Sequence, residues 1–248
     1  MNSYHRFAFY YDMLTKNIDY EKHSDYYDSI ISEFYGKKGI LLDLACGTGS
    51  LSEAMAKKGY DVIGVDLSYE MLSVAMDKKV DSGLPIQYLC QDMCKLDMYG
   101  TVDVTICALD SLNHLPDIKS LELAIKRVSL FSEPGGLFIF DVNTVYKHKC
   151  VLGNNIYIYD TDSVYCIWQN TFTEKDNRVD IDLDFFEKED NCYYRYDESF
   201  SEIAYDLDVI VKICENSGLE IIAVYDYLTR NPVNEKSEKA TFVTRKVR

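Results

Sequence analysis

Ile40-Leu41-Leu42-Asp43-Leu44-Ala45-Cys46-Gly47-Thr48-Gly49-Ser50 is the stretch that decides the fold. Its first half reads as an apolar strand, which ends in a glycine turn and opens into a helix. Glycines let the chain turn sharply and let a ligand approach the main chain, and a helix start offers unpaired N–H groups. Ser50 and Glu53 form the S-x-x-E pattern of a capping box, which predicts a helix beginning at Ser50. This order of elements builds a site for a nucleotide-type cofactor.

Carboxylates follow at the ends of the next two predicted strands. Residues 61–66 read as a strand ending in Asp66, which lies about as far downstream as the ribose-binding acid of a βαβ unit. Residues 86–90 read as a third strand, and Asp92 follows it. Each acid has a structural alternative: Asp43 could cap its turn, Asp66 could begin the next helix, and Asp92 could start a loop. Three acids in this order beside a glycine turn favour the cofactor site.

Two classes of cofactor could use such a site. A dinucleotide-binding fingerprint needs G-x-G-x-x-G, but Ser52 stands at the position of the third glycine. S-adenosylmethionine carries no phosphate, and it has a sulfonium and an ammonium cation, so an acid such as Asp43 beside the turn favours it. We therefore expect S-adenosylmethionine, with an NAD-dependent oxidoreductase as the alternative.

The D-L-A-C-G-T-G of residues 43–49 resembles the first motif of the class I S-adenosylmethionine-dependent methyltransferases. This resemblance covers most of the chain and implies that Gly47 and Gly49 flank the methionine moiety. It also implies that Asp66 holds the ribose and that Asp92 reaches the adenine amino group. Ala45 stands where many members of the family have a first glycine. The predicted cofactor-binding residues are Tyr11, Asp43, Ala45, Gly47, Gly49, Asp66, Leu67, Asp92, Met93 and Ala108.

Composition limits the classes of partner. A chain of 248 residues that is 47% hydrophobic can bury a substantial core. Its net charge of -15 repels phosphate backbones and anionic lipids, so we expect neither nucleic acid nor a membrane as a partner. The eight cysteines contain no C-x-x-C pair, which predicts free thiols, no metal site and a cytoplasmic location. The composition specifies no oligomeric state.

The fold class predicted is α/β. From residue 39 to about 141, short apolar strands alternate with amphipathic helices, which is typical of a doubly wound parallel sheet. A helix over 205–217 and strands over 219–228 and 241–245 follow near the end. An antiparallel pairing of those two strands would complete the mostly parallel, seven-stranded, Rossmann-like sheet that the resemblance implies.

An insertion interrupts this pattern. Residues 155–208 contain fifteen Asp and Glu against four Lys and Arg, and residues 179–185, V-D-I-D-L-D-F, alternate between apolar and acidic. We predict three or four antiparallel strands there. The expected domains are a core of 1–143 and 206–248 and an antiparallel β cap of 144–205 over the acceptor site. The acids of the cap could attract a cationic or amine substrate, or they could form only a solvated face.

The loop after the predicted strand 102–107 should face the transferable methyl group, because ligands of open α/β sheets bind beyond the carboxyl ends of the strands. His114 in this loop is the candidate catalytic base, since a neutral imidazole can take a proton near physiological pH. Its alternative is a packing role at the start of the next helix. The segment 110–115 looks like the corresponding loop of bacterial deoxysugar N-methyltransferases, in which a histidine lies near the acceptor.

The opening segment 4–12 resembles the Y-x-x-F-A-x-x-Y-D start of the same group. The resemblance implies that it folds over the cofactor, with Tyr4 and Tyr11 as lid residues beside the acceptor. A helix that packs on the sheet is the alternative. We assign no role to His5, His23 or His148.

These patterns together predict an S-adenosylmethionine-dependent methyltransferase. We expect it to act on an amine or hydroxyl of a small-molecule acceptor by in-line displacement. A module that binds S-adenosylmethionine without catalysis, and that engages a protein through its cap, is the remaining alternative.

Overall fold

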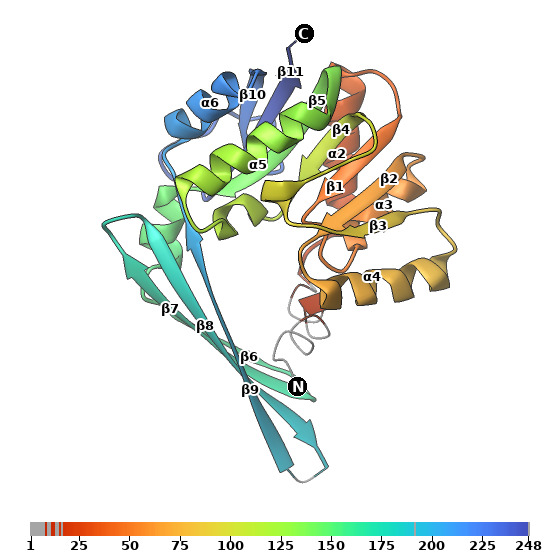
Figure 1. Cartoon of the computed structure of the whole chain (residues 1–248). Helices are drawn as coiled ribbons and strands as arrows, with labels where there is room; N and C mark the ends of the chain where they lie inside the picture. Colours follow the sequence, from red (N-terminus) through yellow and green to blue (C-terminus); the bar gives the residue numbers. More distant parts are fainter. Residues whose placement is uncertain (1–7, 9–10, 13–14, 16, 191, 248) are drawn as a thin grey trace.

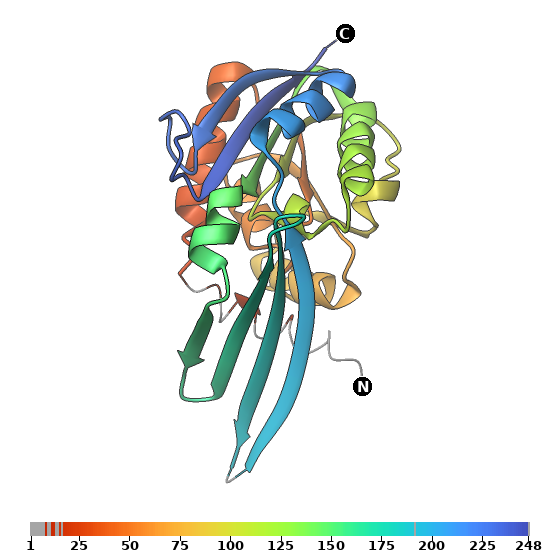
Figure 2. The ribbon, with the colours of Figure 1, turned by 90° about the vertical axis from the view of Figure 1, so that its left-hand side faces the viewer.

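Two sheets make up the fold of this protein (Figure 1). The computed structural model describes residues 8, 11–12, 15, 17–190 and 192–247. A seven-stranded sheet carries helices on both faces, and a separate four-stranded antiparallel sheet extends from it (Figure 2). This architecture confirms the predicted fold class.

The large sheet has the strand order β10-β11-β5-β4-β1-β2-β3. Its neighbours pair in parallel except at β11, which is antiparallel to both β5 and β10. The predicted hairpin of the last two strands is therefore confirmed. The strands are β1 (Ile40–Leu44), β2 (Asp61–Asp66), β3 (Gln87–Cys90), β4 (Val102–Cys107), β5 (Ser132–Asn143), β10 (Leu219–Asp226) and β11 (Lys239–Lys246).

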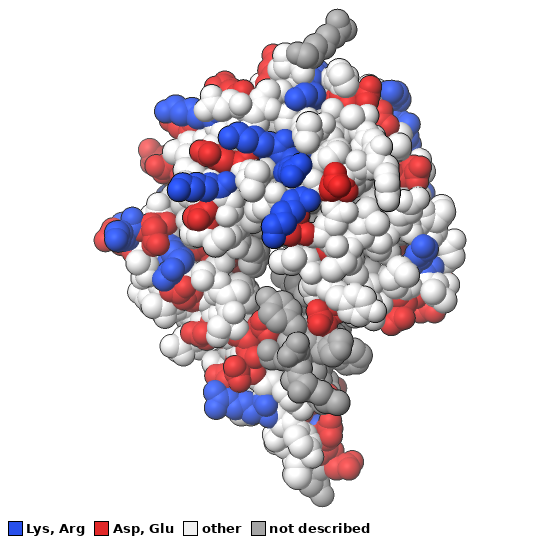
Figure 3. All heavy atoms as spheres, in the orientation of Figure 1, with Lys and Arg blue, Asp and Glu red and all other residues white. Residues whose placement is uncertain are grey.

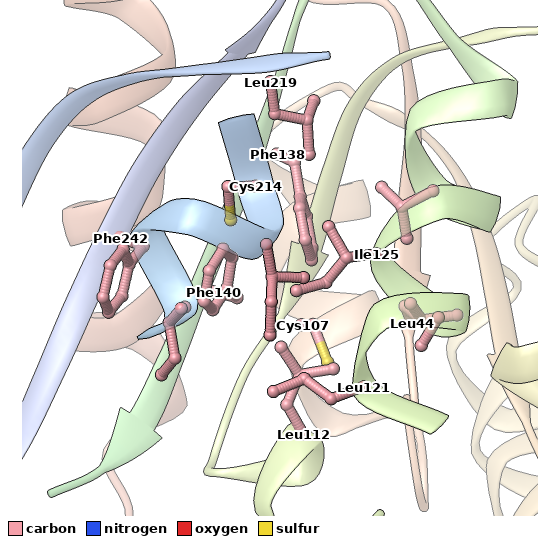
Figure 4. Close-up of a cluster of buried hydrophobic side chains, with 14 of the residues drawn as sticks. Leu44, Cys107, Leu112, Leu121, Ile125, Phe138, Phe140, Cys214, Leu219 and Phe242 are labelled. Carbon is pink, nitrogen blue, oxygen red and sulfur yellow. The ribbon is translucent and has the colours of Figure 1, made fainter. Parts of the chain in front are cut away.

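Successive side chains of a strand point to opposite sides of the large sheet, and both sets are buried because helices cover both faces. Phe138 and Phe140 of β5 lie in one cluster with Ile125 of α5 and Cys214 of α6 (Figure 4). The other face packs on α2 and α3. The α-helices of the described residues are α2 (Tyr20–Phe34), α3 (Ser50–Lys57), α4 (Tyr69–Ser82), α5 (Ile118–Phe131) and α6 (Leu207–Asn216). Two short 3-10 helices, η1 (Met93–Lys95) and η2 (Ser111–His114), and a π-helix, η3 (Lys147–Leu152), lie between them.

The small sheet lies within the segment predicted as an insertion. Its strands β6 (Ile156–Asp160), β7 (Val164–Thr173), β8 (Arg178–Glu189) and β9 (Cys192–Ile203) pair in chain order. Strand β8 alternates as the sequence indicates: Val179, Ile181, Leu183 and Phe185 are buried on one face. We call this the inner face of the small sheet. The intervening aspartates lie on the opposite, outer face, where Arg195 pairs with one of them.

The predicted capping box at the start of α3 is wrong. Gly49, in a left-handed conformation with φ of 75°, is the N-cap, and no side chain caps the helix. Ser50 instead accepts a hydrogen bond from Lys78 Nζ at 2.8 Å. The glycine turn sets the entry into the helix, which moves the cap one residue before Ser50.

The described residues form no helix long and apolar enough to span a membrane.

Candidate active site

The glycine turn lies at the carboxyl end of β1. Gly47 and Gly49 both have positive φ, as does Ala45 at 60°. A Cβ atom on Gly49 would collide with the hydroxyl group of Tyr88, so close packing requires glycine there. A Cβ on Gly47 would meet no atom within 4 Å. The backbone at Gly47 is thus open to a ligand, whereas the backbone at Gly49 is packed against the protein.

A pocket of about 350 Å³, counting space open to solvent, adjoins this turn. Five of the predicted cofactor residues line it, namely Tyr11, Asp43, Ala45, Gly47 and Ala108. They come from the N-terminal segment, from β1 and its turn, and from the end of β4. The fold therefore brings these distant parts of the chain to one pocket at the carboxyl edge of the sheet, as expected for an open α/β sheet.

Asp43 is the buried acid of this pocket, with 2% of its surface exposed. Ser52 donates a hydrogen bond to its carboxylate. Burial raises the pKa of Asp43 to about 7. Ser52 occupies the position of the third glycine of a dinucleotide fingerprint. A glycine there could not donate the side-chain hydrogen bond that Ser52 gives to Asp43. A buried acid at this point suits a cationic ligand and opposes a pyrophosphate.

Asp66, at the end of β2, stabilises the glycine turn through hydrogen bonds. One carboxylate oxygen accepts from the backbone N–H of Gly47 and the other from that of Ser68, both at 2.8 Å. Burial raises the pKa of Asp66. The neighbouring Leu67 is 71% exposed. Asp66 thus has a structural task in addition to its predicted contact with the ribose.

Asp92 and Met93 follow β3 and do not line this pocket. Asp92 is the N-cap of η1, where it accepts from the backbone N–H of Cys94 at 2.9 Å. It also lies 3.5 Å from Lys95 Nζ. Met93 packs against the core on the α5 side of the sheet. Both side chains have local partners, and their contact with adenine stays a prediction.

Asp12, which precedes α2 in the chain, contacts the glycine turn and α4. Thr48 Oγ1 donates to Asp12 at 2.6 Å, and Lys78 Nζ lies 2.5 Å from the other carboxylate oxygen. The same Lys78 donates to Ser50. We call Asp12, Thr48, Ser50 and Lys78 the lid clamp. Tyr11, beside the clamp, is among the pocket-lining residues. Tyr4 lies outside the described residues.

The loop after β4 is held by a buried carboxylate. Leu109 and Asp110 both have positive φ, a strained conformation for residues with side chains. Their backbone N–H groups donate to the two oxygens of Asp141, each at 2.8 Å. This loop leads into η2, which carries His114 at its end.

His114 points toward the inner face of the small sheet. Its ring centroid lies 5.2 Å from that of Phe200, and its Nε2 lies 3.7 Å from Glu202 Oε1. The His114 side chain is 44% exposed, so it is not a core histidine. The structure therefore places the candidate base between the large sheet and the small one.

Glu202 and His148 are polar residues that the sequence did not single out for this region. Glu202 is 5% exposed and accepts from Asn143 Nδ2 at 2.7 Å. His148 is fully buried, and its Nε2 lies 3.4 Å from Oε2 of Glu202. His148 and Glu202 are far apart in the chain, so only the tertiary fold joins them. The alternation of β9 was the available signal for Glu202, because it puts this acid on the face of Phe200.

Comparison with known proteins assigns the family. A family model described as a methyltransferase domain matches residues 41–136. The Bacillus subtilis (strain 168) protein described as "Putative methyltransferase YqeM" is 31% identical over 98% of this chain and 97% of its own. An S-adenosylmethionine-dependent methyltransferase from Clostridium acetobutylicum ATCC 824 is 35% identical, with a TM-score of 0.90 over 100% of both chains. A sugar N-methyltransferase from Streptoalloteichus sp ATCC 53650 shares the fold at 16% identity, with a TM-score of 0.78 over 96% of this chain and 93% of its own.

Because these relatives are methyltransferases, they argue against the alternative of an NAD-dependent oxidoreductase. The open backbone at Gly47 beside the acid Asp43 fits S-adenosylmethionine. The chain belongs to the class I S-adenosylmethionine-dependent methyltransferases, with their Rossmann-like fold.

Proposed function

We propose that this methyltransferase acts on an amine or hydroxyl group of a small-molecule acceptor, which binds between η2 and the inner face of the small sheet. The observation that carries this proposal is the position of His114, at the carboxyl edge of the large sheet and 5.2 Å from the ring of Phe200. Residues 144–205 then serve as a cap over the acceptor. The rest of the chain forms the core that binds the cofactor.

The surface charge supports a small acceptor. The net charge is -15, and Figure 3 shows lysines and arginines interspersed with acidic side chains on the face that it displays. Such a surface does not attract a phosphate backbone. The loop resemblance to deoxysugar N-methyltransferases, and the name of the Streptoalloteichus structure, favour an amine among the small acceptors.

The cofactor, when bound, supplies a methyl group on a positively charged sulfur, and the acceptor's lone pair displaces the sulfur from that carbon. The task of the protein is mainly orientation, which can supply about 7–11 kcal/mol of such a barrier. In our proposal Gly47 and Gly49 hold the methionine part, Asp43 faces its cations and Asp66 binds the ribose. The remaining cofactor contacts proposed are Tyr11, Ala45, Leu67, Asp92, Met93 and Ala108.

His114 takes the proton that the acceptor loses. Glu202 Oε1 lies 3.7 Å from the Nε2 atom of His114, on the side of the small sheet. Tyr11, which lines the glycine-turn pocket, closes the site from the N-terminal side and excludes water in this proposal. The same role for Tyr4 rests on the sequence resemblance alone. Tyrosine suits this task because its ring is apolar while its hydroxyl binds a polar group.

Replacing the proposed base tests this assignment. His114→Asn should lower the rate of methyl transfer about 10²–10⁴-fold, because general base catalysis contributes that much. Its affinity for S-adenosylmethionine should stay unchanged, since His114 is not among the residues lining the glycine-turn pocket. The measurement is transfer of a labelled methyl group to a panel of amines and alcohols, with a calorimetric titration of the cofactor alongside. Full activity of the variant would rule out His114 as the base.

A further inference from the structure

Strand β9 carries two carboxylates on the inner face of the small sheet. Residues 196, 198, 200 and 202 share one face because side chains alternate along a strand. Glu202 on this face contacts His114 and His148, and Phe200 contacts His114. The face that holds Glu198 is therefore turned toward the core and its η2 loop.

Glu198 differs from Glu202 in that one of its carboxylate oxygens has no hydrogen-bond partner among the described residues. It is 6% exposed, and its Oε2 is buried without a hydrogen bond among the described residues. Burial raises the pKa of its carboxyl group. A buried carboxylate without a partner is costly, so such a group is rarely kept for stability. The acids of β8, by contrast, face outward, where Asp182 and Asp184 accept from residues of β9.

The neighbours of Glu198 are suited to an organic cation. Tyr196 and Phe200 flank it on the same face of β9, and Leu183 is its cross-strand partner on β8. Aromatic faces attract ammonium and guanidinium groups, and a nearby carboxylate adds the counter-charge. Glu198 lies two residues from Phe200, which corresponds to about 7 Å along the strand. A ligand that touches His114 can therefore reach Glu198 with a second group.

Building on the function proposed above, we infer that Glu198 is the acceptor-recognition residue and that it binds a positively charged nitrogen of the acceptor. The acceptor is then a small molecule with an ammonium or guanidinium group on a largely apolar frame. This subsite is separate from the atom that receives the methyl group, which lies at His114. The inference therefore predicts that acceptors bound at the inner face of the small sheet are cations.

Ligand binding by a matched pair of variants tests the inference. Glu198→Gln and Asp197→Asn each remove one negative charge, one residue apart, but Asp197 is exposed on the opposite face. The protein is saturated with S-adenosylhomocysteine and titrated with benzylamine, cyclohexylamine and glucosamine. Each amine is compared with its neutral counterpart, namely benzyl alcohol, cyclohexanol and glucose.

We expect at least one amine to bind the wild type tenfold or more tightly than its neutral counterpart. The preference should disappear in Glu198→Gln and persist in Asp197→Asn. The inference is overturned if the wild type prefers no amine, if the preference survives Glu198→Gln, or if Asp197→Asn loses it equally.

The thermal stability of the ligand-free protein gives a second readout. Glu198→Gln should raise the Tm by about 2–4 °C, because it removes an uncompensated buried charge, while Asp197→Asn should leave it unchanged. A lower Tm in Glu198→Gln would mark Glu198 as a structural group and overturn the inference. A different result would contradict the proposed function. In the methyl-transfer assay, that result is labelled methyl groups that appear only on macromolecules.

Discussion

At the scale of single residues, Asp43 connects the local sequence most directly to binding. It lies near the end of an apolar strand, it is 2% exposed, and the neutral hydroxyl of Ser52 donates a hydrogen bond to its carboxylate. Burial without a cationic partner raises the pKa of Asp43 to about 7. A cofactor with two positive charges would supply the missing partner and favour the ionised carboxylate.

The raised pKa predicts that cofactor binding depends on pH. In the free protein the Asp43 carboxyl gains a proton as the pH falls through about 7. Because the cation binds the ionised form, its affinity should fall below pH 7 by up to about tenfold per pH unit. Calorimetric titrations of S-adenosylmethionine at pH 6, 7 and 8 measure this slope. Asp43→Asn should bind more weakly with a flat pH profile, and an unchanged slope in that variant would contradict the assignment.

Folding stability and cofactor affinity should depend on pH in opposite directions. The folded state holds the Asp43 proton between its usual pKa of 3.8 and about 7, whereas the unfolded chain has released it. The contribution of this group to stability is therefore present at acidic pH and is lost as the pH rises to about 7. At neutral pH the buried carboxylate of Asp43 therefore lowers the stability of the folded state. This cost agrees with the role in cofactor binding that we propose for Asp43.

At the scale of elements, α4 holds Asp12 against the glycine turn. Lys78 lies on this helix and reaches Asp12, Thr48 and Ser50 at 2.5, 3.2 and 2.8 Å. The lid clamp thus joins the residue after Tyr11 to the turn that lines the pocket. The clamp holds this part of the pocket wall in place, so we expect it to slow the dissociation of the cofactor.

Loss of the clamp lysine should speed cofactor release. The Lys78–Asp12 pair is partly exposed, with side-chain exposures of 26% and 34%, and such pairs contribute about 0.2–1 kcal/mol. Lys78→Met should therefore raise the dissociation rate of S-adenosylmethionine about twofold to fivefold in stopped-flow displacement. Lys79→Met, the next residue of the same helix, is the control and should leave the rate unchanged. Equal effects of the two changes would show that the clamp has no specific role.

Elements with strong local patterns could be predicted from the sequence. The strand of residues 40–44 and the alternation of 179–185 were recognised because burial follows a fixed period along the chain. The start of α3 at Ser50 agrees with the prediction, but the capping box does not form, because the glycine turn makes Gly49 the N-cap.

At the scale of the whole molecule, the contacts around the proposed acceptor site join distant segments. Asn113 donates to the carbonyl of Ile203 in β9, and Asn143 links Asp110 to Glu202. Sequence periodicity carries no information on such pairs, which explains why His148 and Glu202 were not predicted. The glycine-turn pocket, by contrast, is built largely from β1 and its turn, and five of the ten predicted cofactor residues line it. Their contact with the cofactor stays a prediction.

The most direct test of this account is calorimetric titration with S-adenosylmethionine, S-adenosylhomocysteine and NAD. The wild type should bind the first two at one site per chain and give no heat with NAD. Asp66→Ala should bind S-adenosylmethionine at least about tenfold more weakly, because a hydrogen bond to a charged group contributes about 1.5–3 kcal/mol. Asp61→Ala, at the exposed start of the same strand, should bind like the wild type. Heat with NAD alone, or equal affinity in wild type and Asp66→Ala, would contradict the account.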